Sequence, residues 1–275
     1  MVDDVPGWQE QRRLRQNRAH SARMYDYYLG GHTNYPMDRA AADQVIREFP
    51  AIGMVARVNR DFMRRVTRLL AGRGVSHFLD IGSGIPTSPN LHEVAQGLLP
   101  SARVVYVDND PIVITYADAL LDSTTEGRTD YVEADVNQTA KLLDQPVVKG
   151  LLGLGKPVAL SLNALLHFIG DPRDPYEVVG ELVEALPSGS YLVLSHCTAD
   201  FAPEAWHAIE SIYREGGTFL EVRSLAAVAR FFDGLVLEEP GVVVGHRWHP
   251  ELGEPMKEQP TDADVSLYAG VACKP

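Results

Sequence analysis

From residue 76 onward, short apolar runs alternate with segments that repeat apolar residues at helical spacing. This alternation predicts a parallel sheet with helices on both faces, which is the architecture of an α/β domain. The apolar runs predict strands at residues 77–81, 103–107, 130–134, 158–162, 191–194, 235–237 and 265–271. Helices are predicted around residues 91–98, 111–121, 176–185, 203–214 and 224–232.

Three more helices are predicted ahead of the first strand, at residues 21–29, 38–49 and 52–70. The third carries the clearest apolar stripe, which consists of Val55, Val58, Phe62, Val66 and Leu69. Arg57 and Arg60 lie on another face of this helix, where they either contact solvent or face a ligand carboxylate. The residues up to about 17 are polar and predicted to be weakly ordered. We expect residues 1–71 to form a helical cap on a domain of residues 72–275.

Composition places the chain among soluble globular proteins. Its 275 residues allow a sizeable core, and 45% hydrophobic and 23% charged residues are ordinary values. A net charge of −12 disfavours non-specific binding to nucleic acid or to an anionic membrane. Cys197 and Cys273 form no metal-ligand spacing, and no apolar run is long enough to span a bilayer. The arginine-rich start has no apolar signal core, so a cytoplasmic location is expected.

The stretch at residues 78–84 reads as a buried strand that ends in a glycine-permissive loop. A dinucleotide fingerprint needs a third glycine where Thr87 stands, and the lysine of a phosphate-binding Walker loop is missing too. The loop therefore suits a ligand without a pyrophosphate. S-adenosylmethionine is such a ligand, since its amino-acid end can meet the loop backbone and its ammonium can approach Asp80.

Two more predicted strands also end at an acidic residue. Asp108 follows Gly82 by 26 residues, somewhat beyond the interval of about 20 typical of a carboxylate that binds ribose hydroxyls. The alternative role is a turn aspartate, although Asp110 is better placed to cap the helix that follows. Asp135 could accept from an adenine amino group with Val136 packed on the ring, or it could only cap a helix.

Several segments resemble the successive motifs of class I S-adenosylmethionine-dependent methyltransferases, namely residues 78–84, 104–111, 130–136 and 160–167. More closely, the chain resembles a bacterial family of methyltransferases long catalogued as a domain of unknown function. That resemblance covers residues 22–274, and its most particular elements are residues 23–31, 34–35 and 57–60. It implies a Rossmann-like seven-stranded sheet, mostly parallel with an antiparallel last strand, and an N-terminal helical cap over bound S-adenosylmethionine.

The resemblance also implies a set of cofactor-binding residues, carried over position by position. They are Tyr25, Asp80, Gly82, Ser83, Gly84, Asp108, Asn109, Asp135, Val136, Asn163 and Ala164. By this resemblance, residues 80–84 bind the methionine end of the cofactor, Asp108 and Asn109 bind the ribose, and Asp135 and Val136 bind the adenine. The fourth strand ends without the Asp/Asn-Pro-Pro-Tyr/Phe signature of amino-group methylases, which argues against a nucleobase acceptor.

His167 is the first candidate for a general base, because an unperturbed imidazole titrates near neutrality; packing at a helix start is its alternative role. His32 and Tyr25 are weaker candidates. His196 could line the acceptor pocket, or it could be a buried histidine whose hydrogen bonds are satisfied. His246 and His249 lack a third ligand, so no metal site is predicted.

The sequence thus predicts an enzyme that methylates an oxygen or nitrogen nucleophile of a small molecule. A non-catalytic S-adenosylmethionine-binding regulatory protein is the alternative, and a nicotinamide-dependent oxidoreductase is a third reading. No nucleic-acid or membrane partner is expected, and a homodimer is left open.

Overall fold

A mixed β-sheet forms the centre of the molecule, in a computed structural model that describes residues 18–120, 123–170, 173–255 and 259–275. Its strands are β1 (His77–Ile81), β2 (Arg103–Asp108), β3 (Arg128–Glu133), β4 (Val158–Asn163), β5 (Tyr191–Cys197), β6 (Val236–Leu237), β7 (Val243–Val244) and β8 (Leu267–Cys273). Neighbouring strands follow the order β3-β2-β1-β4-β5-β8-β6, and β7 pairs with β8 outside that order. The weakly ordered start predicted up to residue 17 lies outside the described residues.

Strands β1 to β5 are parallel, whereas β8 runs antiparallel to β5, β6 and β7. This confirms the predicted Rossmann-like sheet with its antiparallel last strand, and β7 adds a short eighth strand. Because β1 lies between β2 and β4, the order of the chain reverses beside β1. Open α/β sheets bind their ligands at such a point, outside the carboxyl ends of the strands.

Helices cover both faces of the sheet, as predicted. On one face, α4 (Ile52–Gly72) and α5 (Leu91–Leu98) bury apolar side chains such as Phe62 and Leu91 against Phe78 and Val104. Phe62 and Val66 of the predicted α4 stripe belong to this cluster, whereas Val55 and Val58 pack in the larger cluster of the core.

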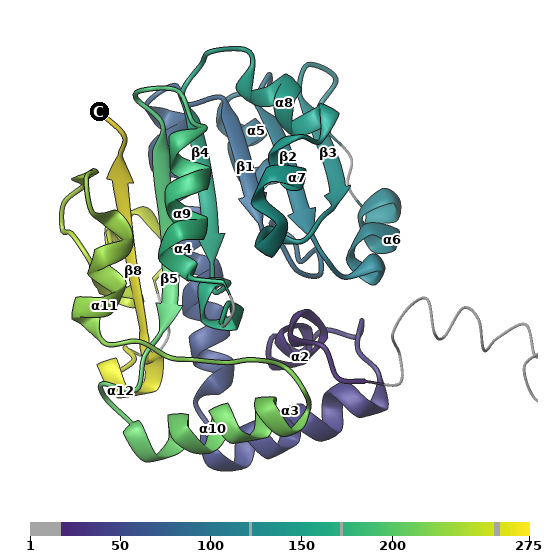
Figure 1. The fold of residues 1–275 in the computed structure, drawn as a ribbon, viewed down its shortest axis with the longest axis vertical. Helices are drawn as coiled ribbons and strands as arrows, with labels where there is room; N and C mark the ends of the chain where they lie inside the picture. Colours follow the sequence, from purple (N-terminus) through teal and green to yellow (C-terminus); the bar gives the residue numbers. More distant parts are fainter. Residues whose placement is uncertain (1–17, 121–122, 171–172, 256–258) are drawn as a thin grey trace, which may run out of the picture.

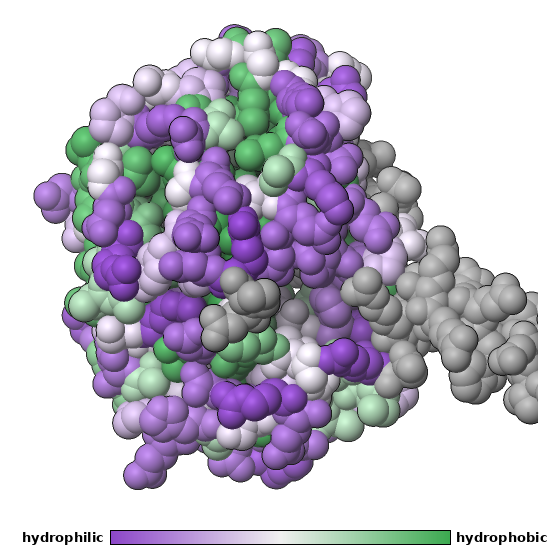
Figure 2. All heavy atoms as spheres, in the orientation of Figure 1, coloured by the Kyte–Doolittle hydropathy of each residue, from purple (hydrophilic) through white to green (hydrophobic). Residues whose placement is uncertain are grey.

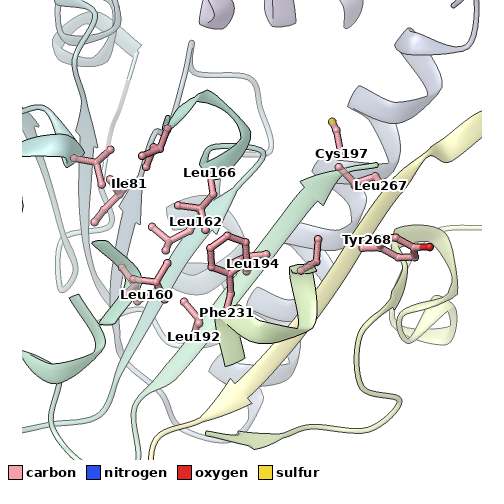
Figure 3. Close-up of a cluster of buried hydrophobic side chains, with 14 of the residues drawn as sticks. Ile81, Leu160, Leu162, Leu166, Leu192, Leu194, Cys197, Phe231, Leu267 and Tyr268 are labelled. Carbon is pink, nitrogen blue, oxygen red and sulfur yellow. The ribbon is translucent and has the colours of Figure 1, made fainter. Parts of the chain in front are cut away.

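The other helices of the sheet domain are α6 (Pro111–Leu120), α7 (Thr139–Leu143), α8 (Pro146–Leu152), α9 (Pro175–Glu184) and α11 (Leu225–Ala229). Figure 3 shows the leucines of β4 and β5 beneath Phe231, which follows α11. Both faces of the central strands are therefore buried, which explains their nearly continuous apolar sequence.

A separate helical layer lies across the carboxyl ends of the parallel strands (Figure 1). It contains α2 (Ser21–Tyr28) and α3 (Pro36–Glu48) from the start of the chain, together with α10 (Pro203–Glu215). The rings of Phe49 and Trp206 pack with centroids 5.7 Å apart and join α3 to α10. At the bottom of Figure 2 the visible surface of this layer is mostly hydrophilic, whereas Val45 of α3 and Trp206 and Ile209 of α10 are buried. The division of the chain at residue 71 stays a proposal, since α10 belongs to the same layer as α3.

A buried group of charges fastens this layer to the sheet domain. Arg23 of α2 lies with its Nε 3.4 Å from Asp38 Oδ1 and 3.7 Å from Asp110 Oδ2. His20 Nδ1 lies 3.2 Å from the same oxygen of Asp110. Asp110 also accepts from the Ile112 amide at 3.1 Å and caps α6, which is the role the sequence assigned to it.

Several short elements differ from the prediction. The sequence reading leaves α7 and α8 unassigned, because helices of 5 and 7 residues hold too few apolar repeats to show a period. Val265 ends a short helix, α12 (Asp262–Val265), and the next residue, Ser266, has a φ of 39°. The last strand therefore begins at residue 267 instead of 265.

Candidate functional site

One cavity of about 280 Å³ lies between the carboxyl ends of the strands and the helical layer. Its lining comes from the loop after β1, the ends of β2 and β4, helices α2, α4 and α10, and the start of β8. Of the residues predicted to hold the cofactor, all except Asp135 line this cavity, and so does His167. The fold therefore brings together side chains that are up to 142 residues apart in the predicted set.

The loop after β1 is held in a left-handed conformation at two glycines. Gly82 has a φ of 73° and Gly84 a φ of 67°, values that side chains with a Cβ rarely adopt. The amides of Gly82 and Ser83 both donate to the carbonyl of Val107, at 2.8 and 3.3 Å. A Cβ at Gly84 would meet nothing within 4 Å, so the cavity leaves the backbone open to a ligand there.

Asp80 lies on β1 just ahead of this loop and lines the cavity. Burial raises the pKa of its carboxyl to about 7, and the nearby charge of Asp108 adds to the rise. The guanidinium of Arg60 opposes that shift. A protonated cationic group placed here would therefore stabilise the ionised carboxylate.

Arg60 is the α4 arginine that reaches the site, whereas Arg57 is exposed. Its guanidinium donates to the carbonyls of Thr87 and Pro89, the second at 3.1 Å. Of the two arginines that the sequence offered for a ligand carboxylate, only Arg60 lines the cavity.

Asp108 is the last residue of β2 and is buried. Its Oδ2 accepts from the amide of Gly84 at 2.8 Å, and its Oδ1 accepts from the amide of Asp110 at 2.9 Å. Asp108 thus shapes the glycine loop as well as lining the cavity. Burial raises the pKa of this carboxyl, and the two backbone hydrogen bonds oppose the shift.

The two residues predicted to bind the adenine line two adjoining spaces. Val136 lines the main cavity, whereas Asp135 lines an adjoining polar recess that shares Asn109 and Ala134 with it. Asp135 Oδ1 accepts from the amide of Asn137 at 2.9 Å and caps a short helical turn. The helix-capping role considered for Asp135 is therefore present.

The end of β4 carries features expected of a ligand site. Both amide atoms of the Asn163 side chain are buried and have no hydrogen-bond partner among the described residues. Ala164 has a φ of 52°, and its amide donates to the Ser195 carbonyl at 3.1 Å and to Ser195 Oγ at 2.9 Å. Buried polar atoms without partners and left-handed backbone often mark functional sites.

Tyr25 of α2 lines the cavity from the opposite side. Its hydroxyl donates to the carbonyl of Ala56 and accepts from Asn59 Nδ2, both at 2.9 Å. Burial raises the pKa of this phenol to about 12. Tyr25 is therefore protonated at neutral pH and cannot serve as the base there.

His167 is buried just after β4, and its Nδ1 has no partner among the described residues. Burial lowers its pKa well below the usual value, and the neighbouring His196 and Arg223 add to the shift. The imidazole is consequently neutral and can accept a hydrogen bond.

The other histidines considered from the sequence do not join this site. His196 has both nitrogens engaged, with the carbonyl of Cys197 at 2.7 Å and with Arg223 at 3.0 Å. His32 is exposed. His246 lies 3.7 Å from Asp262, and His249 contacts Glu251 at 2.6 Å. Within the described ranges, no three potential ligands gather around a metal position.

Sequence reasoning missed two parts of the site. Asn59 and Ser195 connect Tyr25 to Ala164 by hydrogen bonds. Asn59 falls in the family-like segment 57–60 but was given no role, and nothing in the sequence context of Ser195 distinguishes it. The other part is the inner face of α10, where Trp206, Ile209 and Tyr213 line the cavity. Their i, i+3, i+7 spacing gave a signal, but such a stripe usually indicates core packing.

The fold and the cavity define the class of methyltransferases with a Rossmann-like domain. A family model described as S-adenosyl methyltransferase matches residues 7–275, and the chain belongs to that family. A DUF574 family protein from Streptomyces avermitilis is 47% identical, with a TM-score of 0.90 over 95% of this chain and 100% of that one. A putative methyltransferase from Thermobifida fusca is 35% identical, with a TM-score of 0.85 over 100% and 99%.

A more distant structure shares the fold alone. The plantazolicin methyltransferase BpumL, solved with S-adenosylhomocysteine, is 13% identical with a TM-score of 0.52, over 97% of this chain and 99% of that one. No curated protein matches the chain. Family membership makes this protein an S-adenosylmethionine-dependent methyltransferase, as the sequence predicted. None of the helices in the described part of the chain is long and apolar enough to cross a membrane.

Proposed function

We propose that the protein methylates an oxygen or nitrogen atom of a small molecule. The observation that carries this proposal is one continuous cavity, which runs from the glycine loop and the strand ends to the apolar face of α10. One continuous space can hold a methyl donor at the first end and an acceptor at the second. A non-catalytic binding protein would have no need of the second end.

The residues fit S-adenosylmethionine by charge and by hydrogen-bonding capacity. We assign its ammonium to Asp80 and its carboxylate to Arg60. Asp108 and Asn109 suit the ribose hydroxyls, because carboxylate oxygens accept more than one hydrogen bond. Val136 suits the adenine ring, and Asp135 is placed for the adenine amino group if the ring reaches into the adjoining recess.

The assigned residues provide alignment and exclude water. When bound, the cofactor supplies an electrophilic methyl group carried on a sulfonium. The protein then has to align the nucleophile with the methyl group and exclude water from the cavity. The helical layer of α2, α3 and α10 covers the cavity and serves both needs. Neutral His167 accepts a hydrogen bond from the O–H or N–H of the acceptor and thereby orients its lone pair. Its lowered pKa makes His167 a weak base, so the acceptor keeps its O–H or N–H proton until the methyl group has been transferred and then gives it to His167 or to solvent.

Calorimetric titration with S-adenosylmethionine, S-adenosylhomocysteine and NAD tests the first half of the proposal. Saturable binding of the two S-adenosyl compounds without binding of NAD is expected. No binding by folded, ligand-free protein would overturn the assignment of this cavity. Release of S-adenosylhomocysteine that depends on an added acceptor then separates an enzyme from a regulatory binding protein.

Compartment and assembly remain predictions. Cys197 and Cys273 are free thiols, which fits the expected cytoplasmic location. Size-exclusion chromatography with light scattering tests the homodimer.

A further inference from the structure

The two halves of the cavity differ in chemical character. Asp80, Asp108 and Arg60 lie at the half near the strand ends. The opposite half, which we call the α10 half, is lined by apolar and aromatic side chains of α10, α4 and α2. Three of them, Trp206, Ile209 and Tyr213, are no more than 8% exposed.

No ionised side chain lines the α10 half in the part of the chain that the structure describes. His167 borders it and is neutral, because burial lowers the pKa of its imidazole. An ionised group placed there would lose its hydration without gaining a partner of opposite charge. The α10 half therefore disfavours anions and cations alike.

The same half offers a few uncharged hydrogen-bonding groups. Trp206 Nε1 is buried and has no partner among the described residues. The hydroxyls of Tyr28 and Tyr213 lie 3.5 Å apart, at the outer limit of a hydrogen bond. Burial raises the pKa of Tyr213 to about 12 and raises that of Tyr28 well above its usual value, so both phenols keep their protons. A buried donor without a partner is satisfied when a ligand supplies an acceptor atom.

Aromatic rings surround this space. Phe168 and Tyr213 lie with ring centroids 5.7 Å apart at an interplanar angle of 43°. Trp206 packs on Phe49 behind them. Tilted and edge-to-face arrangements of this kind extend naturally to a further ring.

We propose that the α10 half is the methyl-acceptor subsite and that it selects an uncharged, ring-bearing alcohol or amine. This inference rests on the function proposed above, which leaves the character of the acceptor open. The apolar body of the acceptor packs against α10, and one of its polar atoms accepts from Trp206 Nε1 or from the tyrosine pair. Its nucleophilic atom points back toward His167.

Binding of matched probes tests the proposal without relying on turnover. The full-length protein is saturated with S-adenosylhomocysteine at pH 7 and titrated by calorimetry with 2-naphthol and with 2-naphthoate. These probes share a ring system and differ in charge. We expect 2-naphthol to bind saturably and 2-naphthoate to bind at least ten times more weakly.

Three variants locate the probe. Trp206→Phe and Tyr213→Phe keep a ring and remove the polar atom, so at least one of them should weaken 2-naphthol three- to tenfold while leaving S-adenosylhomocysteine affinity unchanged. His207→Ala, on the exposed face of the same helix, should change neither affinity. If a variant fails to fold, the comparison of the two probes on the unaltered protein still decides the matter.

The outcomes separate the two proposals. Binding of S-adenosylhomocysteine with equal affinity for both probes, or with none for 2-naphthol, overturns the acceptor inference and leaves the cofactor assignment intact. Unchanged 2-naphthol affinity in both folded ring variants also overturns it. Failure to bind S-adenosylhomocysteine overturns the proposed function, and the inference falls with it.

Discussion

Asn59 of α4 and Ser195 of β5 are joined by a hydrogen bond of 2.5 Å, in which Ser195 Oγ donates to Asn59 Oδ1. Asn59 Nδ2 donates to the hydroxyl of Tyr25, and Ser195 Oγ accepts from the amide of Ala164, both at 2.9 Å. Four residues from α2, α4, β5 and the end of β4 thus form one chain of contacts. Its far end is a left-handed residue at the cavity wall, so the position of α2 is tied to the shape of the site.

Removing either partner should destabilise the fold, since the other is left buried without its hydrogen bond. Asn59→Ala and Ser195→Ala should each lower the free energy of unfolding by about 1–3 kcal/mol. The double variant should show a coupling energy of about 0.5–3 kcal/mol in urea denaturation. Ser211→Ala, on the exposed side of α10, is the control and should change little. Additive single effects would show that the two residues act independently.

Cofactor binding should release a proton from Asp80. Its pKa is about 7 in the free protein, and an ammonium beside the carboxylate lowers that value. Affinity should therefore fall as the pH drops below 7, by up to tenfold per pH unit. Calorimetry at pH 6 in buffers of different ionisation enthalpy measures the released proton directly. Asp80→Asn should bind weakly at every pH and release none at this site.

Asp108→Ala should weaken cofactor binding by about 1.5–3 kcal/mol, as expected for lost hydrogen bonds to a charged group. The structure adds a second effect, because the amides of Gly84 and Asp110 lose their acceptor. Asp108→Asn keeps one oxygen acceptor and should be intermediate in both affinity and stability. Unchanged calorimetric affinity in a folded alanine variant would remove Asp108 from the cofactor site.

The two loop glycines should respond differently to alanine. Gly84→Ala should cost about 1–2 kcal/mol of stability, from the left-handed backbone alone. Gly82→Ala should cost more, because its Cβ would lie 2.7 Å from Leu165 Cδ1. A larger residue at Gly82 thus crowds the cavity wall before it reaches a ligand. Thermal denaturation of both variants checks the order, and equal losses would contradict it.

Acid should destabilise the free protein through its buried histidines. The pKa of His196 is about 3 in the fold, against 6.5 when unfolded, so below pH 6.5 the unfolded chain takes up the proton. His167 acts in the same direction. His196 alone removes about 1.4 kcal/mol per pH unit over that range. Asp80 has the opposite effect between pH 7 and 3.8, because its folded pKa is the higher one.

Two variants separate these contributions in urea denaturation between pH 7 and 5. His196→Gln should flatten the dependence of stability on pH, and Asp80→Asn should steepen it. Parallel slopes in all three proteins would show that neither group titrates as described.

The sequence predicts the sheet well because buried parallel strands are nearly continuous apolar runs, and each of the main ones here ends at a recognisable residue. The same reasoning placed Asp80, Asp108 and the glycine loop at one edge, since parallel strands share that edge. Asp110 was separated from Asp108 on helix-capping grounds alone, and its contact with the Ile112 amide confirms this.

What the sequence could not give depends on contacts between distant elements. Ser195 sits inside an apolar strand and Asn59 inside an amphipathic helix, so their pairing appears only when β5 meets α4. The pKa of His167 is likewise lowered by burial in the folded protein and, to a smaller extent, by His196 and Arg223, which lie further along the chain. The pKa of a free imidazole therefore predicts a stronger base than His167 is in the folded protein.

The helical layer that covers the cavity combines segments far apart in the chain, since α3 and α10 lie side by side. During synthesis, Phe49 emerges from the ribosome more than 150 residues before Trp206, its ring partner. Until then the side of α3 that packs against α10 lacks its partner, even if the first strands have already paired. The binding cavity is therefore among the last parts of this protein to close, and a chain cut before α10 would keep the sheet edge but lack an enclosed site.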